Sequence, residues 1–86
     1  MRLEVPASAS LKEKRHVVKS ILDTTRNKFN VSAAEISHLD SHKTAGLAFA
    51  CVSNEAVFIN KVLNKIIDLV ESNHLCEVVD TGIEMV

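Results

Sequence analysis

Two amphipathic segments constrain the fold of this chain more than any other feature. Between residues 59 and 70 the apolar positions recur every three or four residues, which is the period of a helix with one buried face: Ile59, Val62, Leu63, Ile66, Ile67 and Val70. A second stripe runs from residue 11 to 29, through Leu11, Val18, Ile21, Leu22, Thr25 and Phe29. Both segments are predicted to be helices that bury one face against another layer.

Four short segments around these helices have the composition of strands. Residues 1–5 alternate in polarity, 31–36 mix β-branched and small side chains, and 45–52 and 75–79 are largely apolar. The order is therefore βαββαβ, and right-handed crossovers favour an antiparallel four-stranded sheet ordered 4-1-3-2 with both helices on one face. We expect an α+β, ferredoxin-like fold in which residues 1–86 form a single domain around one core.

Charge and hydropathy exclude several classes of partner. Lys and Arg total 10 and Asp and Glu total 11, so no overall field attracts nucleic acid or an anionic membrane, and we expect no DNA partner. The longest apolar stretches are far shorter than the roughly 20 residues that span a bilayer, so a cytoplasmic protein without membrane contact is expected. In such a reducing compartment Cys51 and Cys76 are predicted to be free thiols.

The strand predicted at 45–52 is apolar on both sides. Leu47, Phe49 and Cys51 form one set of alternate positions, and Ala48, Ala50 and Val52 form the other. If both helices cover one face of the sheet, the other face exposes apolar side chains that water does not normally tolerate. We expect a homodimer to cover this open face, with Leu47, Phe49 and Cys51 as the candidate contact residues.

Basic side chains gather on the first predicted helix. Lys12, Arg15, Lys19 and Arg26 share one flank, and Lys14 lies on the opposite flank. Cations in a first turn oppose the helix dipole, whereas a bound anion there would offset that cost. These five residues are therefore candidates for binding an anion or RNA. The alternative is a solvated face with intrahelical pairs, such as Arg15 or Lys19 with Asp23, and the sequence favours this alternative.

Other chemistry-bearing residues carry weaker signals. His38, Asp40 and His42 have alternate spacing, but a zinc site needs three or four ligands, and an exposed polar loop without metal is expected. We predict no cofactor and no catalytic residue, because the cysteines, histidines and acidic residues follow no catalytic order. RNA recognition by stacking on the sheet is disfavoured, since Phe49 is the one Phe predicted on a strand.

Three stretches in order, SLKEKRHVVK, RNKFNVSAAEI and ACVSNE, resemble the YlxP-like family, a bacterial domain of unknown function (number 503). The resemblance covers nearly the whole chain. It implies a ferredoxin-like domain, described as dimeric or unassigned, whose genes often lie among those for translation factors and ribosome maturation. No activity, cofactor or catalytic residue is implied.

Together these observations predict a non-enzymatic, homodimeric binding module associated with translation or ribosome maturation. The alternative is direct binding of ribosomal RNA through the basic flank of the first helix.

Overall fold

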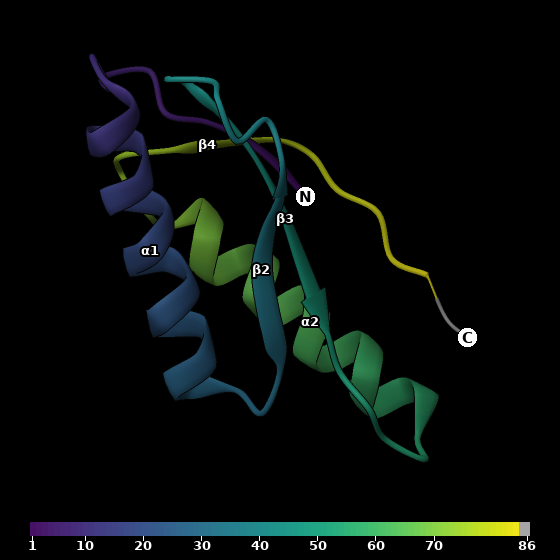
Figure 1. The fold of residues 1–86 in the computed structure, drawn as a ribbon. Helices are drawn as coiled ribbons and strands as arrows, with labels where there is room; N and C mark the ends of the chain where they lie inside the picture. The colour runs from purple at the N-terminus through teal and green to yellow at the C-terminus, as the bar shows by residue number, and fades with distance from the viewer. Residues whose placement is uncertain (85–86) are drawn as a thin grey trace.

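The computed structural model describes residues 1–84 and contains six regular elements in βαββαβ order (Figure 1). Met85 and Val86, which close the predicted domain, lie outside the described residues. The elements are β1 (Arg2–Glu4), α1 (Leu11–Lys28), β2 (Ser32–Ser37), β3 (Thr44–Ala50), α2 (Ala56–Glu71) and β4 (Glu77–Asp80). The predicted α+β class, with two helices and four strands, is confirmed.

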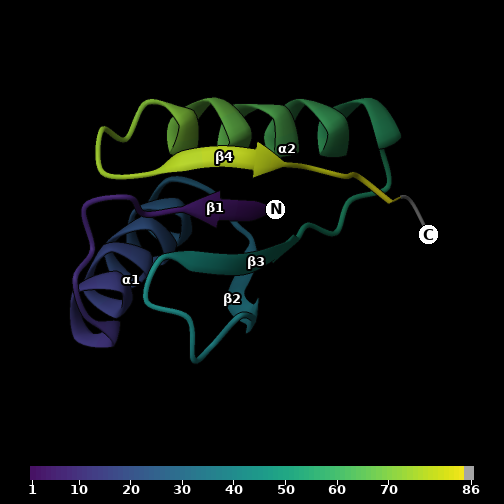
Figure 2. The same ribbon diagram turned by 90° about the horizontal axis from the view of Figure 1, so that it is seen from above.

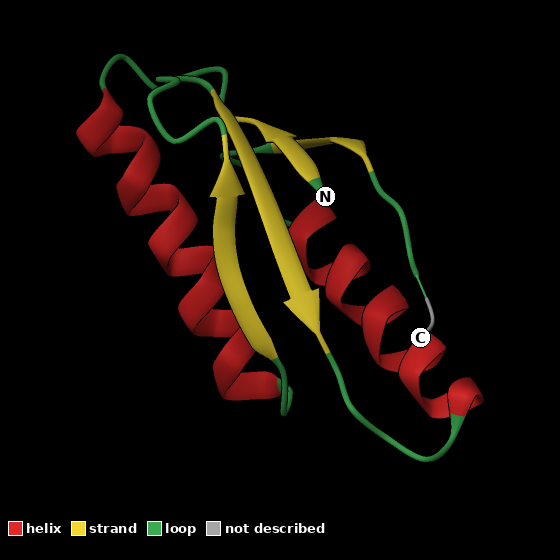
Figure 3. Cartoon of the chain, turned by 45° about the vertical axis from the view of Figure 1, so that its right-hand side comes forward, coloured by secondary structure: helices red, strands yellow, loops and turns green. Residues whose placement is uncertain are grey.

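The four strands form one antiparallel sheet in the order β2-β3-β1-β4. Counted from its β4 edge, the same order reads 4-1-3-2. The strands differ in length. β2 and β3 are long, whereas β1 and β4 are short (Figure 3). The hydrogen bonding between β1 and β3 extends to Met1, whose carbonyl oxygen accepts a hydrogen bond from the N–H of Leu47 at 2.7 Å.

Local capping fixes the start of α1 where the sequence predicts it. The Ser10 hydroxyl oxygen accepts a hydrogen bond from the N–H of Glu13 at 3.1 Å, and the Glu13 carboxylate accepts one from the N–H of Ala9 at 2.6 Å. The first bond satisfies an N–H group that a helix start otherwise leaves without a partner, and the second ties the preceding residue to the same turn. At the other end, the N–H of Phe29 donates to the carbonyl oxygen of Thr25.

Both helices pack on one side of the sheet. Figure 1 shows α1 beside β2, and Figure 2 shows α2 running along β4. Leu3 and Ala45 are paired across β1 and β3, and both are fully buried. They belong to a single apolar cluster that also contains Val18, Ile21, Leu22, Ala33, Leu47, Ile66 and Val70. Because α1 and α2 both contribute to this cluster, no helix within residues 1–84 covers the opposite face of the sheet.

The positions of β3 that face outward are the reverse of those predicted. Leu47 is 1% exposed, and Phe49 packs against the core from the same side of the strand. Cys51, two positions further on, is half-buried, whereas Ala48 and Ala50 are exposed. The prediction that Leu47, Phe49 and Cys51 line the open face is therefore wrong. Both sets are apolar, and the larger side chains turn toward the helices because their burial removes more apolar area from water.

Lys14 ties α1 to the hairpin between β2 and β3. Its side chain is 0% exposed, and its ammonium Nζ donates to Glu35 Oε2 at 2.7 Å. The same Nζ donates to the carbonyl oxygens of His38 at 3.0 Å and Thr44 at 3.3 Å. Three acceptors thus match the three N–H donors of the ammonium, which is the condition for burying a charge.

We expect Lys14→Met to lower the free energy of unfolding by about 3 kcal/mol, because the carboxylate of Glu35 and two carbonyl groups lose their donor. Urea denaturation measures this change. Lys12→Met is the matched control on the exposed side of the same turn, with an expected change within about 0.5 kcal/mol. Equal stability of the two variants would show that the buried pair does not hold the hairpin to α1.

Candidate functional site

The predicted basic flank of α1 is exposed but partly neutralised. Lys19 Nζ lies 2.7 Å from Asp23 Oδ2, and Arg26 Nη1 lies 3.4 Å from Asp23 Oδ1. Arg26 also donates to the carbonyl oxygen of Ala33. Within residues 1–84, Lys12 and Arg15 form no ion pair. The intrahelical pairing predicted for Lys19 is confirmed, and two unpaired cations remain near the start of α1.

The pair formed by Lys19 and Asp23 has a small electrostatic effect. The hydrogen bond from Lys19, helped by the charges of Lys19 and Arg26, lowers the pKa of the Asp23 carboxyl group below its ordinary value of 3.8. A carboxyl group with a lowered pKa stabilises the folded state when the pH is above the ordinary pKa. This stabilisation is lost as the pH falls from the ordinary pKa through the lowered one. Since these side chains are well exposed, solvent screens the pair.

Lys14 does not belong to any accessible basic surface. Its ammonium is enclosed between Glu35 and two backbone carbonyl groups, as described above. The prediction that Lys14 helps to bind an anion or RNA from solution is therefore wrong, since its side chain is fully buried. The sequence shows a run of cations from Lys12 to Arg15, and tertiary packing alone separates the buried one from its exposed neighbours.

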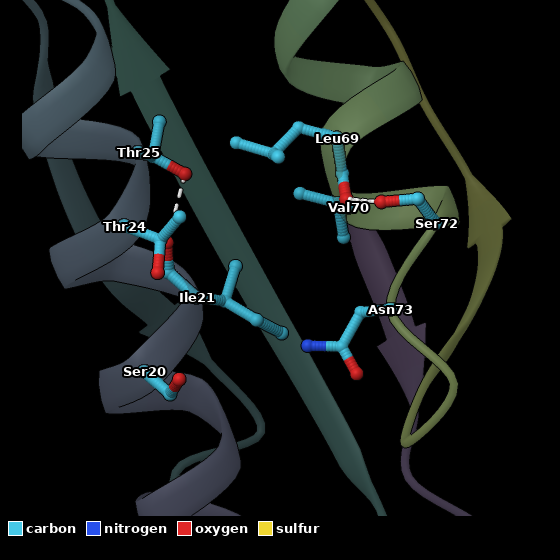
Figure 4. Close-up of a pocket in the computed structure, with 8 residues that line it drawn as sticks. All are labelled: Ser20, Ile21, Thr24, Thr25, Leu69, Val70, Ser72 and Asn73. Atoms are coloured by element: carbon cyan, nitrogen blue, oxygen red, sulfur yellow. Dashed lines mark hydrogen bonds between the residues drawn. The ribbon is translucent and has the colours of Figure 1, made fainter.

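A cleft between α1 and α2 is shown in Figure 4. Its volume is about 180 Å³, and its polar groups are hydroxyl and amide side chains. The Thr25 hydroxyl donates to the carbonyl oxygen of Ile21 at 2.8 Å, and the Ser72 hydroxyl donates to that of Leu69 at 2.6 Å (Figure 4). No titratable side chain lines this cleft, so it offers no acid or base for chemistry.

The hairpin loop between β2 and β3 carries the histidines considered for a metal. His38, Asp40 and His42 are exposed, and His38 Nδ1 lies 3.1 Å from the Ser37 hydroxyl oxygen. Across residues 1–84, no three His, Cys, Asp or Glu side chains are grouped so that they could hold a metal ion. His38 has a backbone φ of 59°, and its carbonyl oxygen accepts from Lys14, so the loop is shaped by backbone contacts.

A groove that the sequence does not reveal lies where α1 ends and α2 begins. It has a volume of about 340 Å³, and three lysines line it: Lys28 at the end of α1, and Lys61 and Lys65 one turn apart on α2. Phe29 and Phe58 lie in the same groove. The sequence assigns these two rings to two different predicted helices, so it does not bring them together. The spacing of Phe58, Lys61 and Lys65, which places them on one helix face, was the available signal. We name this feature the Lys–Phe groove.

The open face of the sheet carries small side chains along β2 and β3. Ala34 and Ala48 are directly paired across the two strands, and Ser32 is paired with Ala50. All four are exposed. Ile36, which lies at an irregularity of the β2–β3 register, is 62% exposed. On the inner strand β1, Arg2 and Glu4 alternate with the buried Leu3 and lie on this same face. The surface therefore combines a strip of small side chains on β2 and β3 with charged side chains on β1.

Comparison with known proteins identifies the family. The family described as "Protein of unknown function (DUF503)" matches residues 1–83. The chain belongs to this family. It is also 40% identical over 65 residues to the uncharacterized protein YlxP of Bacillus subtilis (strain 168), an alignment that covers 76% of this chain and 71% of YlxP. The resemblance found in the sequence is thereby confirmed.

None of the helices described for this DUF503 domain is both long enough and apolar enough to cross a membrane.

The two cysteines of this DUF503 domain are free thiols, as predicted, and differ in environment. Cys76 is buried, and its thiol approaches the carbonyl oxygen of Val70 at 3.6 Å, whereas Cys51 is half-buried in the Lys–Phe groove. Burial raises the pKa of the Cys76 thiol above its ordinary value of 9.0. The folded state therefore holds this proton more tightly than the unfolded state does. The contribution of the protonated Cys76 thiol to stability is lost as pH rises above about 9.

We expect iodoacetamide to modify Cys51 at least about tenfold faster than Cys76 in the folded protein, because alkylation needs an accessible thiolate. Peptide mass spectrometry of timed samples measures both rates. In urea the two rates should converge, which is the control for intrinsic reactivity. Equal rates in the folded protein would contradict the burial of Cys76.

Proposed function

We propose that this protein acts by binding, as a non-enzymatic module on a ferredoxin-like scaffold that self-associates through the open face of its sheet. The observation that carries the proposal is the exposed set of Ala34, Ile36, Ala48 and Ala50 on the face opposite the helices. Small side chains let two sheets approach closely, and Ile36 supplies an apolar anchor at the edge of the patch.

A second copy of the chain is the partner that fits this face best. A twofold contact brings identical patches together, so the Ala34–Ala48 pair can lie near the axis of both copies. Arg2 and Asp80, paired across β1 and β4 on the same face, supply opposite charges beside the apolar strip. Such an arrangement places polar and charged groups next to apolar surface, as protein interfaces do.

The size of the face sets the expected strength. Four strands spaced about 4.8 Å apart give a patch roughly 20 Å on a side, so about 400 Å² in projection. Stable dimers bury about 800 Å² on each partner, which is roughly one seventh of the 5673 Å² surface of this chain. We therefore expect a weak dimer that depends on concentration. We also propose a cytoplasmic location, in keeping with the short apolar stretches of the sequence. From the family resemblance, we propose a role in translation or ribosome maturation.

We expect sedimentation equilibrium to show a mass that rises from monomer toward dimer as concentration reaches the high micromolar range. Ile36→Glu should shift the protein to monomer, because a charge would be buried in the contact. The control is Val57→Glu, since Val57 is 77% exposed on α2 and lies away from the open face. A monomer mass at every concentration, or equal effects of the two substitutions, would reject the dimer.

A second candidate function is contact between RNA phosphates and the start of α1. Lys12 and Arg15 favour it, because both are exposed and have no ion-pair partner within residues 1–84. Two phosphate contacts would give a slope of only about −1.4 for the logarithm of affinity against that of salt. Loss of RNA affinity on charge reversal at Lys12 and Arg15 would support this candidate over a solvated face.

A further inference from the structure

The Lys–Phe groove joins three segments that are distant in the sequence. Lys28 and Phe29 come from the end of α1, Cys51 and Val52 follow β3, and the remaining lining side chains project from α2. The ends of α1 and β3 and the start of α2 lie at the same end of the molecule (Figure 1). A hollow of about 340 Å³ at this junction has the size of a site for one ring system with its substituents.

The charge of the groove is uncompensated. Lys28, Lys61 and Lys65 line it, and none of them forms an ion pair within residues 1–84. No acidic side chain is among the lining residues, and the first turn of α2 contains no acidic residue. Lys61 and Lys65 are four positions apart, where like charges on a helix destabilise it. The repulsion between Lys61 and Lys65 therefore opposes folding slightly, and three cations around one hollow favour an anion.

The apolar side of the groove is unusually exposed for such large side chains. Phe58 is 50% exposed and Val52 is 97% exposed. Phe29 packs partly against the core and so provides a fixed wall, whereas the ring of Phe58 is accessible. An aromatic face beside lysines is the combination that proteins use to bind single-stranded nucleic acid, where the ring stacks on a base and the cations contact the flanking phosphates.

We propose that the Lys–Phe groove binds single-stranded nucleic acid, with one base against Phe58 and the adjoining phosphates on Lys61, Lys65 and Lys28. Single-stranded nucleic acid carries each flat base between two negatively charged phosphates, and this pattern matches an apolar hollow with cations around it. An acidic peptide fits less well, because a groove of this volume holds one anchor, whereas a docked helix needs anchors over several turns. This site is separate from both the open face and the start of α1.

The test is fluorescence anisotropy with labelled oligouridylate and oligothymidylate of roughly ten nucleotides at low salt. We expect both to bind wild-type protein, with a logarithmic salt slope of about −2 for three phosphate contacts at about −0.7 each. Lys61→Glu with Lys65→Glu should weaken binding about tenfold or more, since two charge-assisted contacts are lost. Phe58→Ala should weaken it about fivefold or more through the lost stacking.

Matched variants separate this groove from the rest of the surface. Lys43→Glu, at an exposed position of the β2–β3 hairpin, changes the net charge by the same amount as Lys61→Glu alone. Val57→Ala trims an exposed apolar side chain one residue from Phe58. Both should leave affinity within about twofold, near the measurement error. Circular dichroism confirms that each variant is folded.

Three results would overturn the proposal. One is no binding by the folded wild-type protein at low salt. Another is an equal loss of affinity from Lys43→Glu and from Lys61→Glu, which would indicate a diffuse field. The third is competition by polyglutamate as effective as that of the oligonucleotides per unit charge, which would assign the groove to acidic protein segments. A preference for the RNA or for the DNA probe supports the site and identifies which sugar it accepts.

Discussion

The packing of both helices on one side of the sheet decides what every strand residue does. Leu3, Ala45 and Leu47 point into the cluster that joins Val18 of α1 to Ile66 of α2. Their neighbours along each strand must then point to the other side, because successive side chains alternate. The helices thus determine at once which residues form the core and which form the open face. The dimer proposal depends on this division.

The elements of this fold could be predicted from local patterns, but the orientation of β3 could not. Helical periodicity located α1 and α2, and the Ser10–Glu13 capping pattern located the start of α1. In β3 both sets of alternate residues are apolar, so periodicity gives no preferred face. The choice depends on volume: Leu47 fills the space beneath the helices, whereas Ala48 would leave a cavity there.

Lys14 shows a second limit of local patterns. In the sequence it is one of three cations in four residues, and its neighbours Lys12 and Arg15 are exposed as expected. Its burial depends on Glu35 and on two carbonyl groups of the β2–β3 hairpin, all more than twenty positions away along the chain. The residues next to Lys14 in the sequence do not indicate this burial, because a lysine is buried only where the folded chain brings hydrogen-bond acceptors together around it.

Long-range contacts also decide which side chains form the candidate sites. The predicted basic flank is present on α1, but Asp23 pairs with Lys19 and Arg26 and leaves fewer free cations than the sequence suggests. Conversely, the Lys–Phe groove combines side chains from two helices and the loop after β3, and no single stretch of sequence contains the set. Family membership does not fill this gap, since the matching family and its YlxP relative are described as of unknown function and uncharacterized.

The division of the sheet into a buried and an open face can be measured directly with methyl-resolved NMR and a dissolved paramagnetic agent. At low protein concentration the agent should broaden the methyl signals of Ala34 and Ala48 and leave those of Leu3, Leu47 and Val70 sharp, because the latter lie in the core. At high concentration the signals of Ala34 and Ala48 should recover as the open face becomes covered. Broadening of Leu47 together with protection of Ala48 in the dilute sample would contradict the account.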